Sequence, residues 1–508
     1  MTSIRVKSIA IIGGGPSGVV AAKYLRAEKA FDKITIFEQR SALGGTWHYT
    51  PNQTSEDLFA VPQIDPKGGN QDPTWTPAQK HEGKEADSAR KHNDVASFLT
   101  PIYEELETNV PKSLMQFQDL QWPDHLPLFP SHGAVVNYLQ EHGREVQDLV
   151  EYETQVIKVE PLDKSLTGSW TVTTRNLRTR EEKKEVFDAV IVANGHFITP
   201  HVPDVPGIRE WSQKYPGRIT HSKYFRRAES YAGKKVVVVG NSASGVDISA
   251  QLVSVTEQPI IWSIRSASQL KPLPDPQRPE YSKISKFVPD DGSIHFDDGR
   301  IEHDVDAIIF ATGYYYSLPF LSSLKPQPVG DGRRVQHTYK HLFYAPRPTL
   351  SFLALNVRGV PFTLAEAQSA VLSRVYSGRL ALPPSSELLE WDVKALAAHG
   401  RTHQFHVLDA PTDGLFINEM AAWALKAERV RGLENNGQGR LAPVWGPWEF
   451  WCRANLPGIR AAFSAKGEGR TRVREIEELG AELKGASEAK RREAVEVRES
   501  EVIVQARL

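Results

Sequence analysis

Cysteine, net charge and long apolar runs are all scarce in this chain, and each absence narrows its class. The single cysteine, Cys452, excludes an intramolecular disulfide and a redox centre built on paired thiols. The net charge of −1 gives no indication of a nucleic-acid partner or a charged membrane surface. No apolar run approaches the roughly 18 residues of a membrane span, and we find no signal peptide. We therefore expect a cytoplasmic protein without a membrane anchor.

The first motif is a glycine-rich turn between an apolar strand and a helix. Ile9–Ile12 run into the turn, and a helix-compatible segment, Val19–Lys29, follows it. In this context the pattern G-x-G-x-x-G indicates a dinucleotide site. Glycines allow a tight turn and close approach to a pyrophosphate, which the helix N-terminus attracts. The predicted cofactor residues here are Gly13, Gly14, Gly15, Pro16, Ser17 and Gly18.

An acidic residue after the next apolar run indicates which dinucleotide binds. Lys33–Phe37 end in Glu38, at the distance of about 20 residues where a carboxylate accepts hydrogen bonds from a ribose. A carboxylate repels a 2′-phosphate, so we expect FAD or NAD in this unit and not NADP. A second glycine turn follows at once, and its position predicts that Gly45, Thr46 and Trp47 contact the same ligand.

The opening pattern recurs beyond residue 200. Val236–Val239 lead into a second glycine turn, a helix is expected over Val246–Leu252, and a further strand ends at Arg265. Arginine suits a phosphate, so this unit is predicted to bind NADP(H). Ser242 replaces the central glycine, which makes the turn looser. The predicted cofactor residues of this unit are Gly240, Ser242, Ala243, Ser244, Gly245 and Arg265.

The ends of the two units also match. Asp306–Gly313 repeat Asp188–Gly195 almost position for position. We therefore predict an α/β fold with two Rossmann-like dinucleotide-binding domains, for FAD and NADP, the second inserted in the first. The predicted division is residues 1–200 for the first part of the FAD-binding domain with a polar insertion at 51–97, 201–320 for the NADP-binding domain, 321–463 for the second part with a Trp-rich helical segment, and 464–508 for a charged tail.

Several segments around the two units carry weaker signals. A small antiparallel excursion is predicted between Val156 and Val192, with a charged loop at Arg178–Lys184. The tryptophans beyond residue 386 are interpreted as core, and the tail as a solvated helix or a disordered segment. The final Ala506-Arg507-Leu508 keep the small–basic–leucine form of a peroxisomal signal, so import into peroxisomes is an alternative location.

Two dinucleotides in one chain imply hydride transfer from a nicotinamide to a flavin. Without a cysteine pair, the reduced flavin is left to react with oxygen or with an acceptor that the sequence does not reveal. Val110 precedes Pro111 and is extended, so Thr108 and Asn109 lie where a helix or turn ends. Spacing alone gives Asn109 no more than a role in that turn.

From Ile9 to Trp423 the chain resembles the flavin-containing monooxygenases, especially the soluble fungal type. Residues 215–225 are similar to the family fingerprint F-x-G-x-x-x-H-x-x-x-[FY], with Tyr215 in place of the first Phe. Gly44–Trp47, Gly240–Gly245 and Ala311–Tyr314 match as well. The resemblance implies FAD, NADP(H) and molecular oxygen. It also implies a hydroperoxyflavin that oxygenates an amine nitrogen or sulfur of a small molecule, as in N,N-dimethylaniline monooxygenases, in a fungal biosynthetic pathway.

The resemblance also assigns roles to residues. It makes Asn109 the catalytic residue that steadies the peroxyflavin, and it places Thr108 and Asn109 against both cofactors. His221 becomes a linker residue that shapes NADP binding and not a base. Thr312 and Gly313 join the cofactor residues.

Alternatives remain open from the sequence. Baeyer–Villiger enzymes carry Trp where this chain has Phe225, which favours oxygenation of amines and sulfides over ketones. An uncoupled NADPH oxidase and, outside the enzymes, a degenerate flavoprotein that serves as an interaction module are the other readings. No metal site is expected, and a homodimer is possible.

Overall fold

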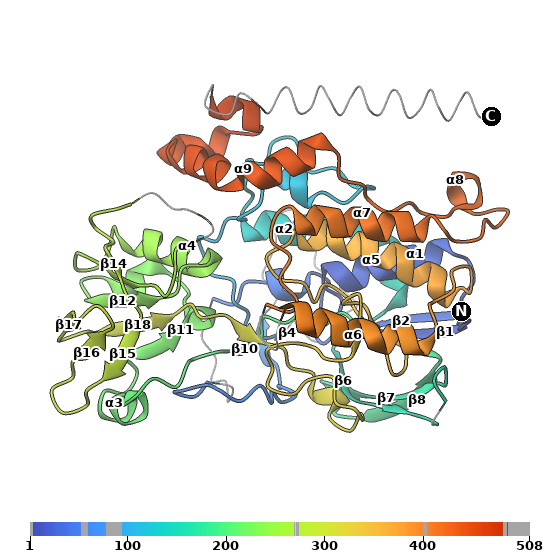
Figure 1. The fold of residues 1–508 in the computed structure, drawn as a ribbon, viewed down its shortest axis with the longest axis horizontal. Coiled ribbons are helices and arrows are strands. Elements are labelled where there is room, and N and C mark those ends of the chain that lie inside the picture. Colours follow the sequence, from blue (N-terminus) through green and yellow to red (C-terminus); the bar gives the residue numbers. More distant parts are fainter. Residues whose placement is uncertain are drawn as a thin grey trace.

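The computed structural model describes residues 4–51, 59–77, 94–163, 165–268, 270, 274–399, 404–480 and 485. Two sheets form its centre, and they lie side by side in Figure 1. No helix among the described residues is long and apolar enough to cross a membrane. The C-terminal Ala506-Arg507-Leu508 lie outside the described residues.

The larger sheet has seven strands in the order β20-β21-β22-β9-β1-β2-β5. The five from β22 to β5 are parallel, and β20 and β21 add an antiparallel edge. The strands are β1 (Ser8–Ile12), β2 (Lys33–Phe37), β5 (Val150–Glu151), β9 (Ala189–Val192), β20 (Thr338–Tyr339), β21 (Phe343–Tyr344) and β22 (Leu350–Phe352).

Both faces of this sheet are covered, which explains why its strands read as continuous apolar runs. Ile9 and Ile11 of β1 face helices, whereas Ala10 and Ile12 face a separate three-stranded antiparallel sheet. The helices on the first face are α1 (Pro16–Ala27), α2 (His132–His142), α5 (Pro361–Tyr376), α7 (Thr412–Ala424) and α9 (Pro447–Ser464). The antiparallel sheet is β6 (Thr154–Pro161), β7 (Trp170–Asn176) and β8 (Glu182–Phe187).

This antiparallel sheet confirms the predicted excursion but corrects its last connection. The charged residues from Glu182 onward form β8 and are not a loop, because the outer face of that strand is solvent-exposed and accommodates charge. Asp188 then separates β8 from β9, so the apolar run predicted as one strand is divided between two sheets.

The smaller sheet has five parallel strands in the order β11-β18-β12-β13-β14. They are β11 (Ile219–His221), β12 (Val236–Val239), β13 (Ile261–Ser263), β14 (Glu280–Tyr281) and β18 (Ala307–Phe310), flanked by α3 (Ile208–Lys214) and α4 (Ala243–Leu252). All of these elements lie in sequence between β9 and β22, which are neighbours in the larger sheet. The second unit is therefore inserted in the first, and the predicted fold class is confirmed.

Shorter elements complete the chain. Within the predicted polar insertion, β3 pairs with β4, and Trp75 of β3 lies under the Arg178 guanidinium at 4.2 Å. The remaining strands and α-helices are β3 (Thr74–Pro77), β4 (Asp94–Ser97), β10 (Thr199–Pro200), β15 (Ile284–Phe287), β16 (Ile294–Phe296), β17 (Ile301–Glu302), β19 (Tyr314–Tyr315), α6 (Ser385–His399) and α8 (Glu434–Gly437). The 3₁₀ helices are η1 (Gly45–Trp47), η2 (Lys112–Met115), η3 (Arg144–Leu149), η4 (Ser222–Tyr224), η5 (Ala228–Tyr231), η6 (Pro319–Leu321), η7 (Gly467–Arg472) and η8 (Ile476–Leu479).

The C-terminal segment joins the core of the first unit. Trp445 and Trp448 are buried there, which confirms their interpretation as core residues. The predicted solvated or disordered tail is wrong for residues 473–479, whereas residues 464–472 are exposed or half-buried. Val473, Ile476 and Leu479 are buried in the same core, because apolar residues three apart share one face while the charges between them stay outside.

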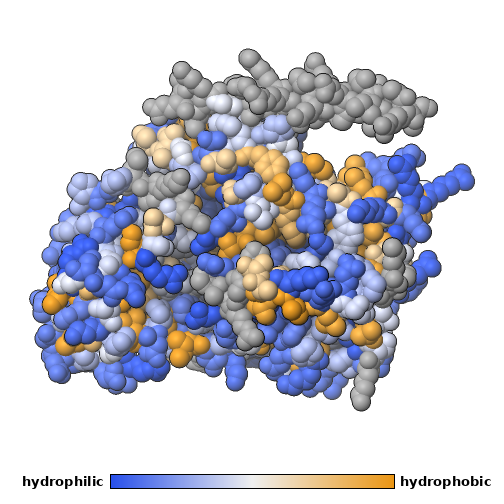
Figure 2. All heavy atoms as spheres, viewed as in Figure 1, coloured by the Kyte–Doolittle hydropathy of each residue, from blue (hydrophilic) through white to orange (hydrophobic). Residues whose placement is uncertain are grey.

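Figure 2 shows apolar residues gathered around α9 and α7, and hydrophilic residues dominating the second unit.

Candidate active site

The first glycine turn is packed so closely that side chains are excluded from it. Gly13 has φ of +106°, and a Cβ there would lie 2.7 Å from the Ala193 carbonyl oxygen. A Cβ at Gly18 would lie 1.9 Å from the Gly13 carbonyl oxygen. The helix α1 begins at Pro16, and no side chain caps its N-terminus. Its first N–H groups are thus available to an anion.

Glu38 is fixed at the end of β2 beside this turn. Its carboxylate accepts hydrogen bonds from the Gly14 N–H at 2.6 Å and from the Arg40 N–H at 2.7 Å. The side chain is buried, and burial raises the pKa of Glu38, while Arg40 and Gly14 oppose that rise. Burial lowers the pKa of Arg40 to about 10. Two N–H donors and a neighbouring cation keep this carboxylate in place.

The second glycine turn lies directly against the first. The Gly44 N–H donates to the Gly14 carbonyl oxygen at 3.0 Å. A Cβ added at Gly45 would lie 2.9 Å from the Gly15 Cα. The buried hydroxyl of Thr46 has no hydrogen-bond partner in the structure, and Trp47 packs against Phe362. A glycine cradle, an uncapped helix and an unpaired buried hydroxyl together fit a dinucleotide.

The second unit repeats this geometry. Gly240 has φ of +111°, and a Cβ there would lie 2.5 Å from the Ala311 carbonyl oxygen. A Cβ at Gly245 would lie 2.1 Å from the Gly240 carbonyl oxygen. These are the relations of Gly13 and Gly18, so the repeat seen in the sequence is a repeat in space.

The departure from the glycine pattern leaves the second turn open. Ser242, which replaces the central glycine, is exposed and makes no capping hydrogen bond with α4. Ala243 and Ser244 start this helix and are half-buried. Arg265 is exposed two residues beyond the end of β13. The turn therefore fits a dinucleotide as the first one does, and Arg265 lies one residue further beyond its strand than Glu38 does.

His221 links the ends of two neighbouring strands. Its Nδ1 accepts from the Lys223 N–H at 3.1 Å, so its Nε2–H donates to the Gly313 carbonyl oxygen at 3.1 Å. Complete burial lowers the pKa of His221 to about 3, so the ring is neutral at physiological pH. The adjacent Thr312 hydroxyl donates to the His201 carbonyl oxygen. The ring therefore positions the chain at the end of β18, as a linker residue does.

The Thr108–Asn109 segment lies where the two units meet. The Thr108 N–H donates to the Pro130 carbonyl oxygen and its hydroxyl to the Val110 carbonyl oxygen, both at 2.9 Å. Asn109 itself is exposed. Just upstream, the Tyr103 hydroxyl donates to Asp247 on α4 of the second unit. The backbone next to Asn109 is thus held in place by Thr108, while the Asn109 side chain is exposed.

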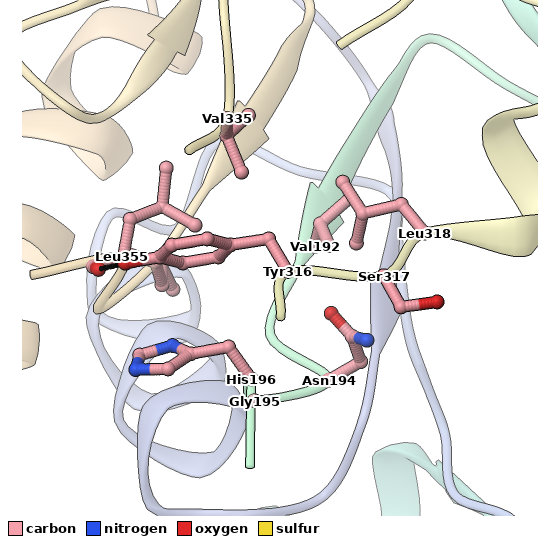
Figure 3. Close-up of a pocket in the computed structure, with 10 residues that line it drawn as sticks. Val192, Asn194, Gly195, His196, Tyr316, Ser317, Leu318, Val335 and Leu355 are labelled. Atoms are coloured by element: carbon pink, nitrogen blue, oxygen red, sulfur yellow. Dashed lines mark hydrogen bonds between the residues drawn. The ribbon is translucent and has the colours of Figure 1, made fainter. Parts of the chain in front are cut away.

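A small pocket at the carboxyl ends of β9 and β22 contains residues that the sequence analysis missed. Figure 3 shows His196 and Tyr316 facing each other there, with ring centroids 4.9 Å apart. Burial lowers the pKa of His196 to about 4. Ligands of α/β proteins bind at this edge of the sheet. The position of His196 directly after the repeated Ala-x-Gly was a signal that could have been used. The lining residues are Val192, Asn194, Gly195, His196, Tyr316, Ser317, Leu318, Val335, Leu353 and Leu355.

Among the described residues, no group of three or more His, Cys, Asp or Glu side chains could hold a metal ion.

A family model described as flavin-binding monooxygenase-like matches residues 89–271 and 282–411. The chain belongs to the flavin-containing monooxygenase family. A model of an NAD(P)-binding Rossmann-like domain matches residues 11–61, over the first glycine turn. Membership identifies FAD and NADP(H) as the cofactors of this monooxygenase, in agreement with the two cradles.

Relatives from plants and fungi share most of the chain. Flavin-containing monooxygenase FMO GS-OX3 of Arabidopsis thaliana is 32% identical over 456 residues, which cover 85% of this chain and 88% of that protein. Flavin-containing monooxygenase iboF of Amanita muscaria is 30% identical over 465 residues, covering 79% and 85%. The structure of S-allyl-L-cysteine S-oxygenase from Allium sativum superposes with a TM-score of 0.71 at 28% identity, covering 96% of this chain and all of that one.

Proposed function

We propose that this flavin-containing monooxygenase uses NADPH and oxygen to oxygenate a soft nucleophile, an amine nitrogen or a sulfur, in a small molecule. The observation that carries the proposal is the pair of glycine cradles, one in each unit, with the Thr108–Asn109 segment held near the boundary of the two units by its own hydrogen bonds and by Arg460. The sulfur arm has additional support, because the Allium sativum structure that this chain resembles is that of an S-oxygenase.

Each cradle is proposed to hold one cofactor. Gly15 and the uncapped first turn of α1 would bring backbone N–H groups to the FAD pyrophosphate, and Glu38 would accept from its ribose. In the second unit, α4 would receive the NADP pyrophosphate and Arg265 its 2′-phosphate. When bound, the flavin accepts hydride from the nicotinamide and activates oxygen. The chain then needs to orient both rings and to exclude water.

Asn109 is proposed to orient the two rings. Its side-chain amide offers two N–H donors and one carbonyl acceptor, and it does not titrate. The hydrogen bonds of Thr108 fix the backbone from which it extends. An amide held between flavin and nicotinamide would keep NADPH oxidation coupled to substrate oxygenation.

Phe225 supports amine and sulfide substrates over ketones. Its ring is fully buried and packs against Tyr103 and Tyr231, with centroids 5.3 and 5.8 Å away. The ketone-oxygenating enzymes of the resemblance carry the larger Trp here, which this packing leaves little room to accept.

The decisive experiment measures product, peroxide and NADPH together. The purified holoenzyme is incubated with N,N-dimethylaniline, a thioether or cyclohexanone, and we expect an N-oxide or a sulfoxide. A lactone would replace the proposal with Baeyer–Villiger chemistry, and peroxide without oxygenated product would identify an oxidase. Asn109→Ala should consume NADPH but release peroxide, whereas Gln327→Ala, an exposed amide of a surface turn, should keep the wild-type coupling.

The resemblance to soluble fungal members extends the proposal to a biosynthetic step that oxidises nitrogen or sulfur. The relative from Amanita muscaria supports this extension by its fungal source. Accumulation of the unoxidised precursor in a strain lacking the enzyme is the expected result. Unchanged metabolite profiles in that strain would contradict it.

A further inference from the structure

We propose that Arg460 is a positioning residue that holds the Thr108–Asn109 segment at a fixed place relative to the second unit. This inference rests on the proposed function of Asn109. Figure 1 shows α9, which carries Arg460, extending over both α4 and α2. Contacts of Arg460 with Thr108, next to Asn109, and with Asp247 on α4 place α9 at the boundary between the units.

The guanidinium of Arg460 contacts both units. Its Nη1 donates to the Thr108 carbonyl oxygen at 3.2 Å, and its Nη2 lies 3.0 Å from the Glu107 carboxylate. The same Nη2 is 4.0 Å from the Asp247 carboxylate on α4. A planar fork with several N–H groups can make these contacts simultaneously, which an ammonium group does less well.

Aromatic rings hold the guanidinium in this orientation. It lies over Phe129 at 4.8 Å and near Phe463 at 5.6 Å, and the two rings pack against each other. Side-chain exposure of Arg460 is 28%. Because the stem and the charge are both supported, the side chain acts as a rigid spacer between its partners.

Asp247 connects this spacer to the second cofactor cradle. It lies in the second turn of α4, the helix that follows the glycine turn of the second unit. It accepts a hydrogen bond from the Tyr103 hydroxyl and another, at 3.1 Å, from the Gln251 amide. The separation between Asn109 and the proposed NADP cradle is therefore set in part by Arg460 and Asp247.

Arg470 provides a matched control. Its Nε lies 3.1 Å from the other oxygen of Glu107, and a second nitrogen donates to the Gly467 carbonyl oxygen. Arg470 makes an ion pair with Glu107 as Arg460 does, but its further hydrogen bond goes to Gly467 and not to Thr108. Arg470→Ala therefore removes a positive charge near Glu107 and leaves the contacts of the Arg460 guanidinium with Thr108 and Asp247 in place.

The experiment compares Arg460→Ala, Arg460→Lys and Arg470→Ala as FAD-loaded proteins. Hydrogen exchange at the backbone N–H groups of residues 108–110 reports the position of the segment without any turnover. We expect exchange about tenfold faster in Arg460→Ala, an intermediate rate in Arg460→Lys, and a rate within about twofold of wild type in Arg470→Ala. Affinity for NADP⁺ should fall in the same order.

Coupling provides the second readout. Arg460→Ala should release several-fold more peroxide per NADPH than wild type. The double variant Arg460→Ala/Asn109→Ala should release no more than Asn109→Ala, because Arg460 acts through that residue. Additive release, or unchanged exchange at residues 108–110 in Arg460→Ala, would overturn the proposal.

Misfolding of a variant and an inactive wild-type enzyme are two further outcomes of this experiment. If Arg460→Ala does not fold, Arg460→Lys alone tests the proposal, since lysine keeps the positive charge but lacks the planar guanidinium. A rate of hydrogen exchange at residues 108–110 of Arg460→Lys equal to that of wild type would then overturn the proposal. If wild type forms no oxygenated product, the proposed function fails, and the role of Arg460 in placing the segment still stands or falls on exchange and NADP⁺ affinity.

Discussion

At the scale of single residues, Glu38 combines a structural and a cofactor role. Its two carboxylate oxygens accept from the backbone of the glycine turn and from the Arg40 N–H, so the turn is tied to the end of β2. The same oxygens have the lone pairs that a ribose hydroxyl needs. A buried acid is costly unless it is hydrogen-bonded, and here the backbone supplies the bonds.

Replacement of Glu38 tests this combined role. Glu38→Ala should lower FAD occupancy at least about tenfold, since the ribose acceptor and the tether of the turn are lost together. The flavin-to-protein absorbance ratio after gel filtration measures it. Glu160→Ala, from an exposed ion pair with Lys158, should retain full occupancy. Normal flavin content in Glu38→Ala would contradict the assignment.

Arg265 is the residue that should distinguish the two nicotinamide cofactors. Arg265→Ala removes the cation proposed to pair with the 2′-phosphate, so KM for NADPH should rise about tenfold or more while KM for NADH stays nearly constant. Steady-state kinetics with both cofactors measure this. Lys283→Ala, an exposed cation paired with Asp297, is the control. An Arg265→Ala enzyme with the wild-type preference for NADPH would exclude Arg265 from the site.

At the scale of elements, the position of α1 decides where the first cradle lies. The helix packs against α5, and a bidentate pair anchors its C-terminal end. Arg379 donates to both carboxylate oxygens of Glu28 at 2.7 Å, and the Ser377 hydroxyl adds a third bond. Both side chains of the pair are buried, with exposures of 6% for Arg379 and 1% for Glu28. Breaking such a pair leaves a buried charge without compensation.

This anchor predicts a non-additive stability pattern. Arg379→Met alone should destabilise the protein by about 3–5 kcal/mol, whereas Glu28→Met/Arg379→Met should cost less, because no charge is left unpaired. The melting temperatures of the single and the double variant measure this difference in stability. Glu390→Gln, from the exposed pair with Lys394, should change stability by about 0.5 kcal/mol or less. A double variant as unstable as the single one would show that packing dominates instead.

At the scale of the whole molecule, buried neutral histidines couple stability to pH. His221 and His406 are fully buried, and burial holds the pKa of His221 at about 3 and that of His406 well below its usual range. In the unfolded chain both groups titrate near 6.5. Between these values the unfolded chain binds more protons, so stability is complete above about pH 6.5 and falls as the pH is lowered.

The melting temperature should therefore fall between pH 7 and pH 5. Each such histidine contributes a slope that rises to about 1.4 kcal/mol per pH unit as the pH falls towards 5. His221→Gln should melt with a shallower dependence on pH, because one of these groups is removed. His303→Gln changes an exposed ring and should leave the slope of wild type intact. Parallel curves for His221→Gln and wild type would contradict the buried neutral ring.

The sequence by itself determined the two strand–turn–helix units, the insertion of one in the other and the family. These features depend on residues close together in the chain. Each turn is marked by its own closely spaced glycines, and apolar strands covered on both faces read as continuous runs. The match between Asp188–Gly195 and Asp306–Gly313 indicated one plan for both units, and the structure then showed Ala193 and Ala311 against Gly13 and Gly240.

Only the tertiary structure decided what surrounds the cradles. The contact between Arg460 and Glu107 joins residues 353 positions apart, and no local pattern records it. The facing rings of His196 and Tyr316 come from different strand ends. The charges around Ile476 predicted an exposed tail, but Ile476 is buried in the core. Burial depends on the core that a segment meets and not on the composition of the segment alone. Contacts between distant segments form only when the two sheets and α9 pack together, and for that physical reason they could not be read from the sequence.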